Sequence, residues 1–351
     1  MIVNLFLSTD VWTKPLNEFG VKQHVYALYE KVFHGCDQLN IYPKRATGNL
    51  LSNVLQHLPA LFSGKLNVLS PGYPVVIGAI VSWFRRDSGF IVHTWKVPGL
   101  SDNRLSARIH DILLRRVNSC ARAIVVASMT QKRQLEEMGV SCPVVFAPVS
   151  VDSRFWYPDP EGMDDVLSKF RLKSNSYILT VGGSDRDEIY AANMAKVLGL
   201  SYVRATYSPH WAEYAKIQLE QMGLQHHSHI LIRPTDVELR ALYAGAYLLC
   251  LPTLTRTNPA GLTSMVEGMS CGAIVAVPEK IAEGYVHDGC TGFVLKGSPD
   301  EFAMTFSAYG NKLPSIKKNA RYFAESKLNN INIAKKVRYQ FEVANVFNRS
   351  T

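Results

Sequence analysis

One segment, from Asn258 to Val277, constrains the fold more tightly than any other stretch of this chain. It opens with turn-forming residues and continues with apolar side chains at the spacing i, i+3, i+4, i+7, namely Leu262, Met265, Val266 and Met269. Gly272 is a typical residue to end such a helix, and the apolar run 273–277 that follows is typical of a buried parallel strand. The segment therefore predicts a helix with one buried face, followed by a strand of a parallel sheet.

The start of this predicted helix has the chemistry of an anion site. Its first N–H groups and the helix dipole favour a negative ligand, and Gly261 leaves room for that ligand to approach. Thr263 and Glu267 lie four residues apart on one face, about 6 Å along the axis. A phosphate at the helix start and ribose hydroxyls beside the carboxylate together indicate a nucleotide site.

This segment, continued by the turn from His287 to Val294, resembles the donor-nucleotide region of retaining glycosyltransferases of family four. The family helix reads Glu-Ala-Met-Ala-Cys-Gly where this chain has Glu-Gly-Met-Ser-Cys-Gly at 267–272, and the turn is similar to the family's Asp-Gly-x-Thr-Gly motif. The resemblance implies the GT-B fold, an α/β architecture of two doubly wound Rossmann-like domains facing an interdomain cleft. It also implies transfer of a sugar from a nucleoside diphosphate to an acceptor hydroxyl.

The resemblance implies donor contacts from Asn258, Gly261, Leu262 and Thr263, with Glu267 on the ribose. The chain departs from the family at one position. The family pattern has two glutamates separated by seven residues, and the first of them falls here on Pro259. The nearest polar residue is Asn258, so the sugar contacts, the sugar identity and the effect on turnover are left open.

Short apolar runs alternate with amphipathic stretches in both halves of the chain, which predicts two parallel sheets flanked by helices. We expect an acceptor-binding domain over residues 1–155 and a donor-binding domain over 156–330, with a C-terminal helix in 331–351 that packs back on the first domain. The stretch 150–160, rich in Pro and Asp, is the expected linker. By resemblance, the first domain contributes a glycine loop in which Gly20 is kept.

A second candidate site is the Gly-Gly-Ser-Asp-Arg-Asp loop at 182–187, after the predicted strand 177–181. The backbone N–H of Gly183 and the guanidinium of Arg186 suit diphosphate oxygens, because planar bidentate donors match phosphate geometry. A helix-capping loop and an acidic metal site at Asp185 and Asp187 are the alternatives. Arg204 or Arg256 could supply a second positive charge.

Three further residues enter through the resemblance. His93 ends a predicted strand where the family places a histidine against the donor sugar, Arg233 lies in the loop that lines the base pocket, and Thr253 lies beneath the diphosphate. A packed histidine and an ordinary loop threonine are the alternatives. The expected catalytic residues are thus His93, Arg186 and Glu267, and no metal ligand is expected.

The charge distribution points to an anionic partner. The chain has a net charge of +9, and residues 1–150 carry +7 of it, with 16 Lys and Arg against 9 Asp and Glu. Such a surface favours acidic lipids, a lipid-diphosphate acceptor or nucleic acid. Six scattered cysteines without a CxxC pair indicate a reduced, cytoplasmic protein. Residues 1–7 predict a first strand and not a secretory leader, and the longest apolar stretch, 73–84, is too short to span a bilayer.

The expected activity is that of a retaining, metal-independent glycosyltransferase with a UDP or GDP sugar as donor substrate and no further cofactor. The expected setting is cell-surface glycan or glycolipid assembly, in the cytoplasm with peripheral contact to the inner face of the membrane. A DNA-modifying glycosyltransferase that acts on a hydroxylated base and a non-catalytic GT-B scaffold are the alternatives. An oxidoreductase is disfavoured, because neither first strand is followed by GxGxxG.

Overall fold

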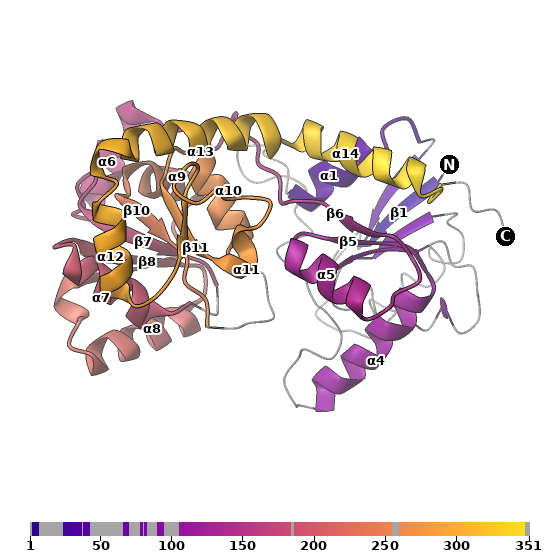
Figure 1. Cartoon of the computed structure of the whole chain (residues 1–351), viewed down its shortest axis with the longest axis horizontal. Coiled ribbons are helices and arrows are strands. Elements are labelled where there is room, and N and C mark those ends of the chain that lie inside the picture. Colours follow the sequence, from indigo (N-terminus) through magenta and orange to yellow (C-terminus); the bar gives the residue numbers. More distant parts are fainter. Residues whose placement is uncertain are drawn as a thin grey trace. The chain divides into compact units, whose positions relative to one another are not determined.

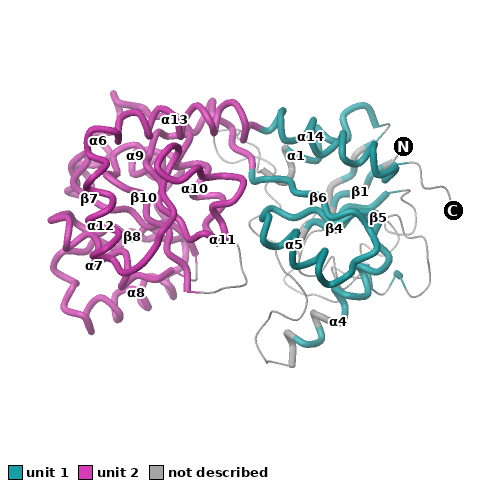
Figure 2. The backbone as a smooth tube through the Cα atoms, in the orientation of Figure 1, with its two compact units in different colours: residues 1–149, 330–351 teal, residues 150–329 magenta. Residues whose placement is uncertain are grey.

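The computed structural model describes residues 2–6, 24–36, 38–42, 66–69, 78–79, 81–82, 90–94, 105–183, 186–254 and 260–347. The chain divides into two compact units, shown with their elements in Figures 1 and 2. Unit 1 comprises residues 1–149 and 330–351, and unit 2 comprises residues 150–329.

Unit 1 is built on a six-stranded sheet in the order β2-β1-β3-β4-β5-β6, in which neighbouring strands are parallel. Apolar runs such as Leu66–Leu69 are fully buried, as expected for a parallel sheet with both faces covered. The strands are β1 (Ile2–Phe6), β2 (Gln38–Tyr42), β3 (Leu66–Leu69), β4 (Phe90–Thr94), β5 (Ala121–Val126) and β6 (Val144–Phe146). The helices with described bounds are α1 (His24–Val32), α4 (Leu105–Ser119), α5 (Met129–Glu137) and α14 (Asn330–Val343).

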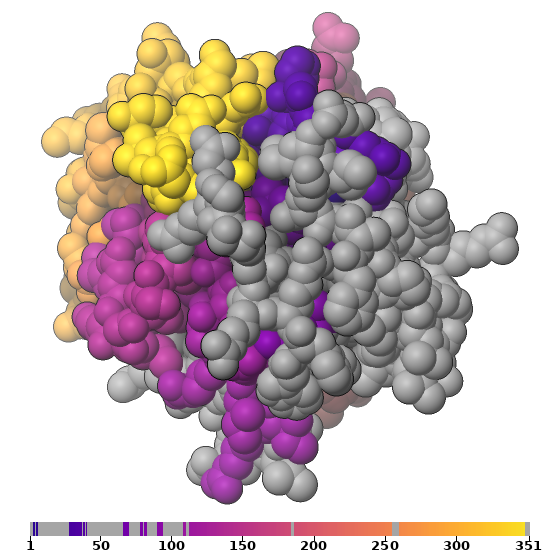
Figure 3. Space-filling model, turned by 90° about the vertical axis from the view of Figure 1, so that its right-hand side faces the viewer, coloured from indigo at the N-terminus to yellow at the C-terminus, as the bar shows by residue number. Residues whose placement is uncertain are grey.

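The C-terminal helix α14 packs against α1, so the end of the chain completes unit 1. In the space-filling view of Figure 3 the atoms of α14 (yellow) lie directly beside those of α1 (indigo). Phe341 is fully buried in α14, and its ring packs edge-on against Phe347. Within the sheet core, Val92 and Val126 pack with Leu114 and Val117 of α4.

Unit 2 repeats the plan with a second parallel sheet, in the order β12-β11-β10-β7-β8-β9. Its strands are β7 (Tyr177–Val181), β8 (Ser201–Thr206), β9 (Ser228–Ile232), β10 (Leu248–Cys250), β11 (Val275–Pro278) and β12 (Phe293–Leu295). The helices are α6 (Pro160–Lys169), α7 (Glu188–Val197), α8 (Pro209–Gln221), α9 (Asp236–Gly245), α10 (Leu262–Ser270), α11 (Glu279–Ala282), α12 (Pro299–Ser307) and α13 (Leu313–Lys327).

Helix α10 confirms the strongest pattern of the sequence. Its four predicted apolar residues are between 0% and 3% exposed, and Gly272 takes the left-handed conformation (φ +77°) just after the helix. The backbone N–H of Ala273 donates to the carbonyl of Gly268, which closes the helix end. Gly268 also sets the helix position, because a methyl group there would lie 2.3 Å from a Leu249 carbon of β10. The helix therefore packs closely on the sheet and holds Glu267 near the edge where the strands have their carboxyl ends.

The longest apolar stretch, 73–84, is described at Gly78, Ala79, Val81 and Ser82. These four residues are helical and buried. In the described parts of the chain, no helix combines the length and the apolar character that crossing a membrane requires.

Candidate functional site

The loops of unit 2 that carry the candidate residues meet at the reversal point of its sheet. From β7 the chain adds β8 on one side and β10 on the other, and ligands of open α/β sheets bind at the carboxyl ends of strands at such a point. The loop after β7 and the loop after β10 are joined there by an antiparallel bridge between Arg186 and Thr253. In addition, the N–H of Asp187 donates to the carbonyl of Pro252 at 3.2 Å.

Arg186 is a buried cation at this edge. Its side chain is only 4% exposed, and Nε donates to the carbonyl of Val181 at 2.9 Å. A methyl group built on Gly182 (φ +143°) would lie 2.3 Å from Nη2, and one built on Gly261 would lie 3.4 Å from it. The guanidinium thus packs over a glycine at the end of β7 and reaches the residue that starts α10.

The start of α10 has the predicted form of an anion site. Gly261 is the N-cap in the left-handed conformation (φ +105°) and provides no side-chain cap. Leu262 points into the core at 3% exposed, so any ligand contact from it would use its backbone N–H, whereas Thr263 is exposed. The first-turn N–H groups, which have no partner within the helix, and the Arg186 charge therefore favour an anion at the same place.

Glu267, one turn further along α10, is half-buried and accepts a hydrogen bond from the Tyr243 hydroxyl at 3.1 Å. Burial, together with the negative charge of Asp236, raises the pKa of Glu267 to about 8, although the Tyr243 hydrogen bond acts in the opposite direction. A carboxyl group with so raised a pKa, at the carboxyl edge of a parallel sheet, is a typical feature of a ligand site.

Two neighbours of Glu267 were missed by the sequence interpretation. Tyr207 follows β8 at the carboxyl edge and is 48% exposed, and burial together with the charges of Glu267 and Asp236 raises the pKa of its phenol. Asp236 starts α9 after the loop that follows β9. Only their position in the sequence could have indicated them, because each follows a predicted strand, and both strands lie on the same side of the reversal point.

Arg233 belongs to the same corner. It takes a left-handed conformation (φ +54°) that is uncommon for a residue with a side chain. Its N–H donates to the carbonyl of Thr206 at 2.7 Å and its Nε to the carbonyl of Tyr207 at 3.3 Å. The exposed Arg233 therefore fixes the backbone that carries Tyr207.

Gly183 and Thr253 complete the loops. Gly183 is exposed, and a methyl group there would meet nothing within 4 Å, so packing constrains Gly182 and not the predicted Gly183. The hydroxyl oxygen of Thr253 is buried and finds no hydrogen-bond partner among the described residues. Such an oxygen costs free energy unless a ligand or water satisfies it.

Arg204, one of the two candidates for a second positive charge at the site, has a structural role instead. It is fully buried, and Nε forms an ion pair with Glu188 at 2.8 Å, while Nη1 donates to the carbonyl of Ala205 at 2.7 Å. The Tyr202 hydroxyl donates to the same carboxylate. The charge of Arg204 is thus already balanced inside unit 2. Arg256, the alternative, lies outside the described residues.

One alternative interpretation of the loop at 182–187 is a metal site formed by its acidic side chains, Asp185 and Asp187. Asp187 caps α7 by accepting the N–H of Tyr190 at 2.9 Å, which is the capping role considered for this loop. Asp185 lies outside the described residues. Across the described ranges, no three residues among His, Cys, Asp and Glu are grouped closely enough to hold a metal ion.

Comparison with solved structures identifies the architecture. HepE of Anabaena in complex with UDP-glucose superposes with a TM-score of 0.74 at 14% identity, covering 98% of this chain and 100% of that one. Sucrose-phosphate synthase of Thermosynechococcus elongatus gives 0.76 at 12% identity, with 97% and 98% covered. A glycosyltransferase of Rickettsia africae gives 0.68 at 15% identity, with 99% of both chains covered.

The chain has the GT-B fold. The fold class expected from the sequence is thereby confirmed. No protein-family model and no curated protein matches the sequence itself.

In the first GT-B unit, His93 is the last residue but one of β4 and is 2% exposed. Its Nδ1 lies 2.9 Å from the hydroxyl oxygen of Tyr29 in α1, and the two rings meet edge-on at 5.6 Å. These contacts fix the orientation of the imidazole at the carboxyl end of the strand. Gly20 and Asn258, two other predicted contacts, lie outside the described residues.

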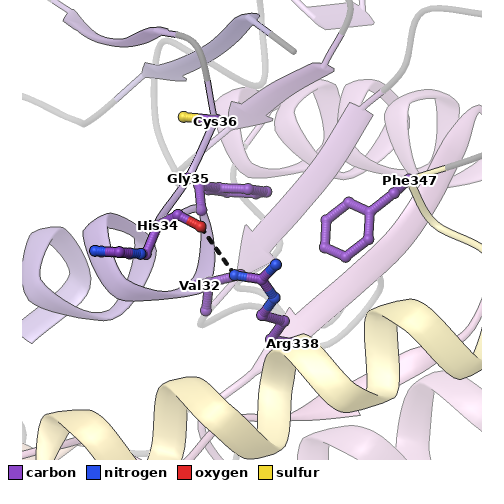
Figure 4. A pocket seen from close by; sticks show the side chains of 7 residues that line it. Val32, His34, Gly35, Cys36, Arg338 and Phe347 are labelled. Atoms are coloured by element: carbon purple, nitrogen blue, oxygen red, sulfur yellow. Dashed lines mark hydrogen bonds between the residues drawn. The ribbon is translucent and has the colours of Figure 1, made fainter.

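Unit 1 also contains a small cavity, drawn in Figure 4. It has a volume of about 110 Å³ and is lined by the end of α1, by Arg338 of α14 and by Phe347. Arg338 closes one side by donating from Nη1 to the carbonyl of His34 at 2.9 Å. No predicted site residue lines this cavity, and it is smaller than the several hundred Å³ typical of ligand pockets.

Proposed function

We propose that this protein is a retaining glycosyltransferase that transfers a sugar from a nucleoside diphosphate to an acceptor hydroxyl. One observation carries the proposal: the guanidinium of Arg186 packs against Gly261, so a buried cation and the N-terminus of α10 act at one place. A diphosphate bound there is stabilised most as its negative charge grows, since donors already in position need no reorganisation. The GT-B fold and the UDP-glucose bound to HepE support this assignment.

The chemical step is the one the family resemblance implies. The acceptor oxygen bonds to the anomeric carbon on the face from which the diphosphate departs, and the carbon–oxygen bond to the diphosphate breaks. A phosphate oxygen of the leaving group takes the acceptor proton. Arg186, Gly183 and the first-turn N–H groups of α10 hold the diphosphate, with the Thr253 hydroxyl beneath it. Leu262 and Thr263 contribute through their backbone N–H groups.

The nucleoside end of the donor lies further along α10 in this proposal. Glu267 accepts hydrogen bonds from the ribose, and Tyr207 offers an exposed aromatic ring beside it. Arg233, which fixes the Tyr207 backbone, and Asp236 supply polar groups for the base edge. A uridine nucleotide is the first choice, because HepE is a UDP-glucose complex with the same fold.

Unit 1 supplies the acceptor side. His93, held by Tyr29, contacts the donor sugar, and Gly20 belongs to the loop that receives the acceptor. Asn258 provides the sugar contact in place of the family glutamate. The basic first unit suits an anionic acceptor such as a lipid-linked diphosphate sugar in glycan or glycolipid assembly, at the cytoplasmic face of a membrane.

Binding and turnover by the purified protein test this function directly. We expect UDP or GDP and their sugars to raise the unfolding temperature by several degrees, since a ligand at one hundred times its Kd adds about 2.7 kcal/mol of stability. We also expect slow hydrolysis of the matching nucleotide sugar. Stabilisation by a nucleotide without any hydrolysis or transfer would favour the non-catalytic scaffold. An unfolding temperature that no nucleotide changes would contradict the proposed donor site.

A second test concerns the absence of a metal requirement. We expect turnover to survive EDTA, because the donor charge is met by Arg186 and α10 and because Asp187 is engaged in capping α7. The measurement is the transfer rate before and after chelation. Loss of activity that Mg²⁺ or Mn²⁺ restores would return Asp185 and Asp187 to consideration as ligands.

A further inference from the structure

Helix α4 of unit 1 has two sides of opposite character. Leu114, Val117 and Asn118 face the sheet and are at most 4% exposed. On the other side Ile109 is 51% exposed and Ile112 is 65% exposed. Residues three apart on a helix are neighbours, so these two side chains form one apolar spot on the outer face.

Basic side chains flank this spot. Arg108 precedes Ile112 by four residues and Arg115 follows it by three, and both are exposed. Within the described part of the chain, neither guanidinium has a hydrogen bond or an ion pair. The third arginine of the helix has a different task, because Arg116 donates to the backbone carbonyl of Ser82 at 2.7 Å and ties α4 down.

The sequence of α4 contains these three arginines against one acidic residue, Asp111, and Figure 1 shows the helix at the lower edge of unit 1. An apolar pair flanked by exposed arginines matches an anionic lipid interface, where isoleucine side chains enter the headgroup boundary and guanidinium groups meet phosphates. The net charge of +7 in residues 1–150 acts in the same direction. A protein partner would not require the unbalanced positive charge.

We propose that the outer face of α4, formed by Arg108, Ile109, Ile112 and Arg115, docks unit 1 on an anionic lipid surface. This deepens the proposed function by naming the surface that would bring unit 1 to a lipid-linked acceptor. Lipid binding itself does not depend on the transfer reaction, so the two proposals can fail separately.

Co-sedimentation with vesicles tests the proposal on the full chain. The vesicles contain phosphatidylcholine alone or phosphatidylcholine with phosphatidylglycerol. Wild type should pellet with the anionic vesicles and not with the neutral ones, and binding should fade as salt rises, because surface charges act over about 8 Å at physiological ionic strength. Arg108→Glu/Arg115→Glu and Ile109→Ser/Ile112→Ser should each reduce partitioning by at least about tenfold.

Helix α14 provides matched controls in the same unit. Lys335→Glu/Lys336→Glu changes the net charge by the same amount at exposed positions, and Tyr339→Ser/Val343→Ser removes apolar side chains that are 66% and 67% exposed. Both should keep near wild-type partitioning. Equal losses in the α4 and α14 variants would overturn the assignment to α4, as would negligible pelleting of wild type or an α4-dependent shift of duplex DNA in place of lipid.

Nucleotide binding by the same variants separates this proposal from the proposed function. The α4 substitutions lie in unit 1, outside the nucleotide site of unit 2, so calorimetric affinity for the nucleoside diphosphate should be unchanged. Lipid binding that disappears while nucleotide binding persists supports the docking surface. Lipid binding that remains in a protein unable to bind any nucleotide would contradict the transferase proposal and leave the α4 proposal standing.

Discussion

Replacement of Arg186 by alanine is expected to reduce kcat/KM for transfer by about 10²–10³-fold, the typical effect of removing one preorganised donor to a leaving-group charge. The loss should fall mainly on kcat, because the interaction strengthens as the diphosphate departs. Some stability should also be lost, since the Val181 carbonyl gives up the hydrogen bond from Nε. Steady-state kinetics on a variant that is shown to be folded measure the effect. Arg154→Ala, which changes an arginine with an 89% exposed side chain in unit 2, is the control for charge alone.

The two glycines before Arg186 give a sharper version of this test. Gly182→Ala leaves the guanidinium in the protein but fills the space that it occupies, at a backbone conformation that alanine rarely adopts. Gly183→Ala adds the same methyl group one residue later, in open space, and keeps the backbone N–H. Activity should therefore fall far more in Gly182→Ala than in Gly183→Ala. Equal activity in the two variants would mean that the observed position of the guanidinium is unimportant.

The sequence predicts those parts of both units in which local pattern and packing agree. The helix α10 was predictable because its apolar period, its glycine stop and the strand after it all indicate the same structure, and each of the four predicted apolar residues is buried. The apolar runs 66–69, 90–94 and 177–181 predict strands for the same reason, and β3, β4 and β7 have these bounds, since apolar runs in a parallel sheet are buried on both faces.

Other elements have no such signal. The strand β2, Gln-Leu-Asn-Ile-Tyr, alternates polar and apolar residues at the edge of the first sheet and was not predicted. Helices α12 and α13 were also not anticipated, although the capping box formed by Ser298 and Glu301 at the start of α12 is a readable signal. Some predicted boundaries differ by a few residues: the sequence pattern predicts a helix over 212–222, whereas α8 begins at Pro209.

Long-range contacts within the site could not be predicted from spacing. Tyr243 lies 24 residues before Glu267, and only the packing of α9 against α10 brings the hydroxyl to the carboxylate. The pairing of Arg204 with Glu188 arises in the same way, from the register of β8 beside the start of α7, and it removes Arg204 from the choice of phosphate ligands. The site residues themselves, from His93 to Glu267, stay predictions until the variants are measured.

Replacement of Glu267 by alanine is expected to weaken binding of the nucleoside diphosphate by about 1–3 kcal/mol, roughly 5- to 150-fold, because the ribose hydroxyls and the Tyr243 hydroxyl lose their acceptor. Isothermal calorimetry measures this directly. Glu220→Gln, at an exposed position of α8, serves as the control for a change of one negative charge in unit 2. An unchanged affinity in a folded Glu267→Ala variant would end the ribose assignment.

The raised pKa of Glu267 predicts how nucleotide affinity and protein stability change with pH. With a pKa of about 8, the carboxyl group of the free protein is mostly protonated at neutral pH. Ribose hydroxyls that donate to this group favour its ionised form, so binding releases a proton, and affinity should rise from about pH 7 to about pH 9. The free energy of unfolding should change in the opposite sense. Because the folded pKa exceeds the usual value of 4.5, the contribution of Glu267 to stability is fully present below about pH 4.5 and is lost as the pH rises through about 8.

Glu267→Gln should remove both trends, because an amide still accepts hydrogen bonds through its one oxygen but does not ionise. Its nucleotide affinity should be nearly constant over this range, and above about pH 8 its unfolding temperature should exceed that of wild type. The two proteins are compared by calorimetry and thermal unfolding at about pH 7 and pH 9. If the variant retains the wild-type slope in either measurement, another group titrates there and Glu267 is not the residue that couples ribose binding to pH.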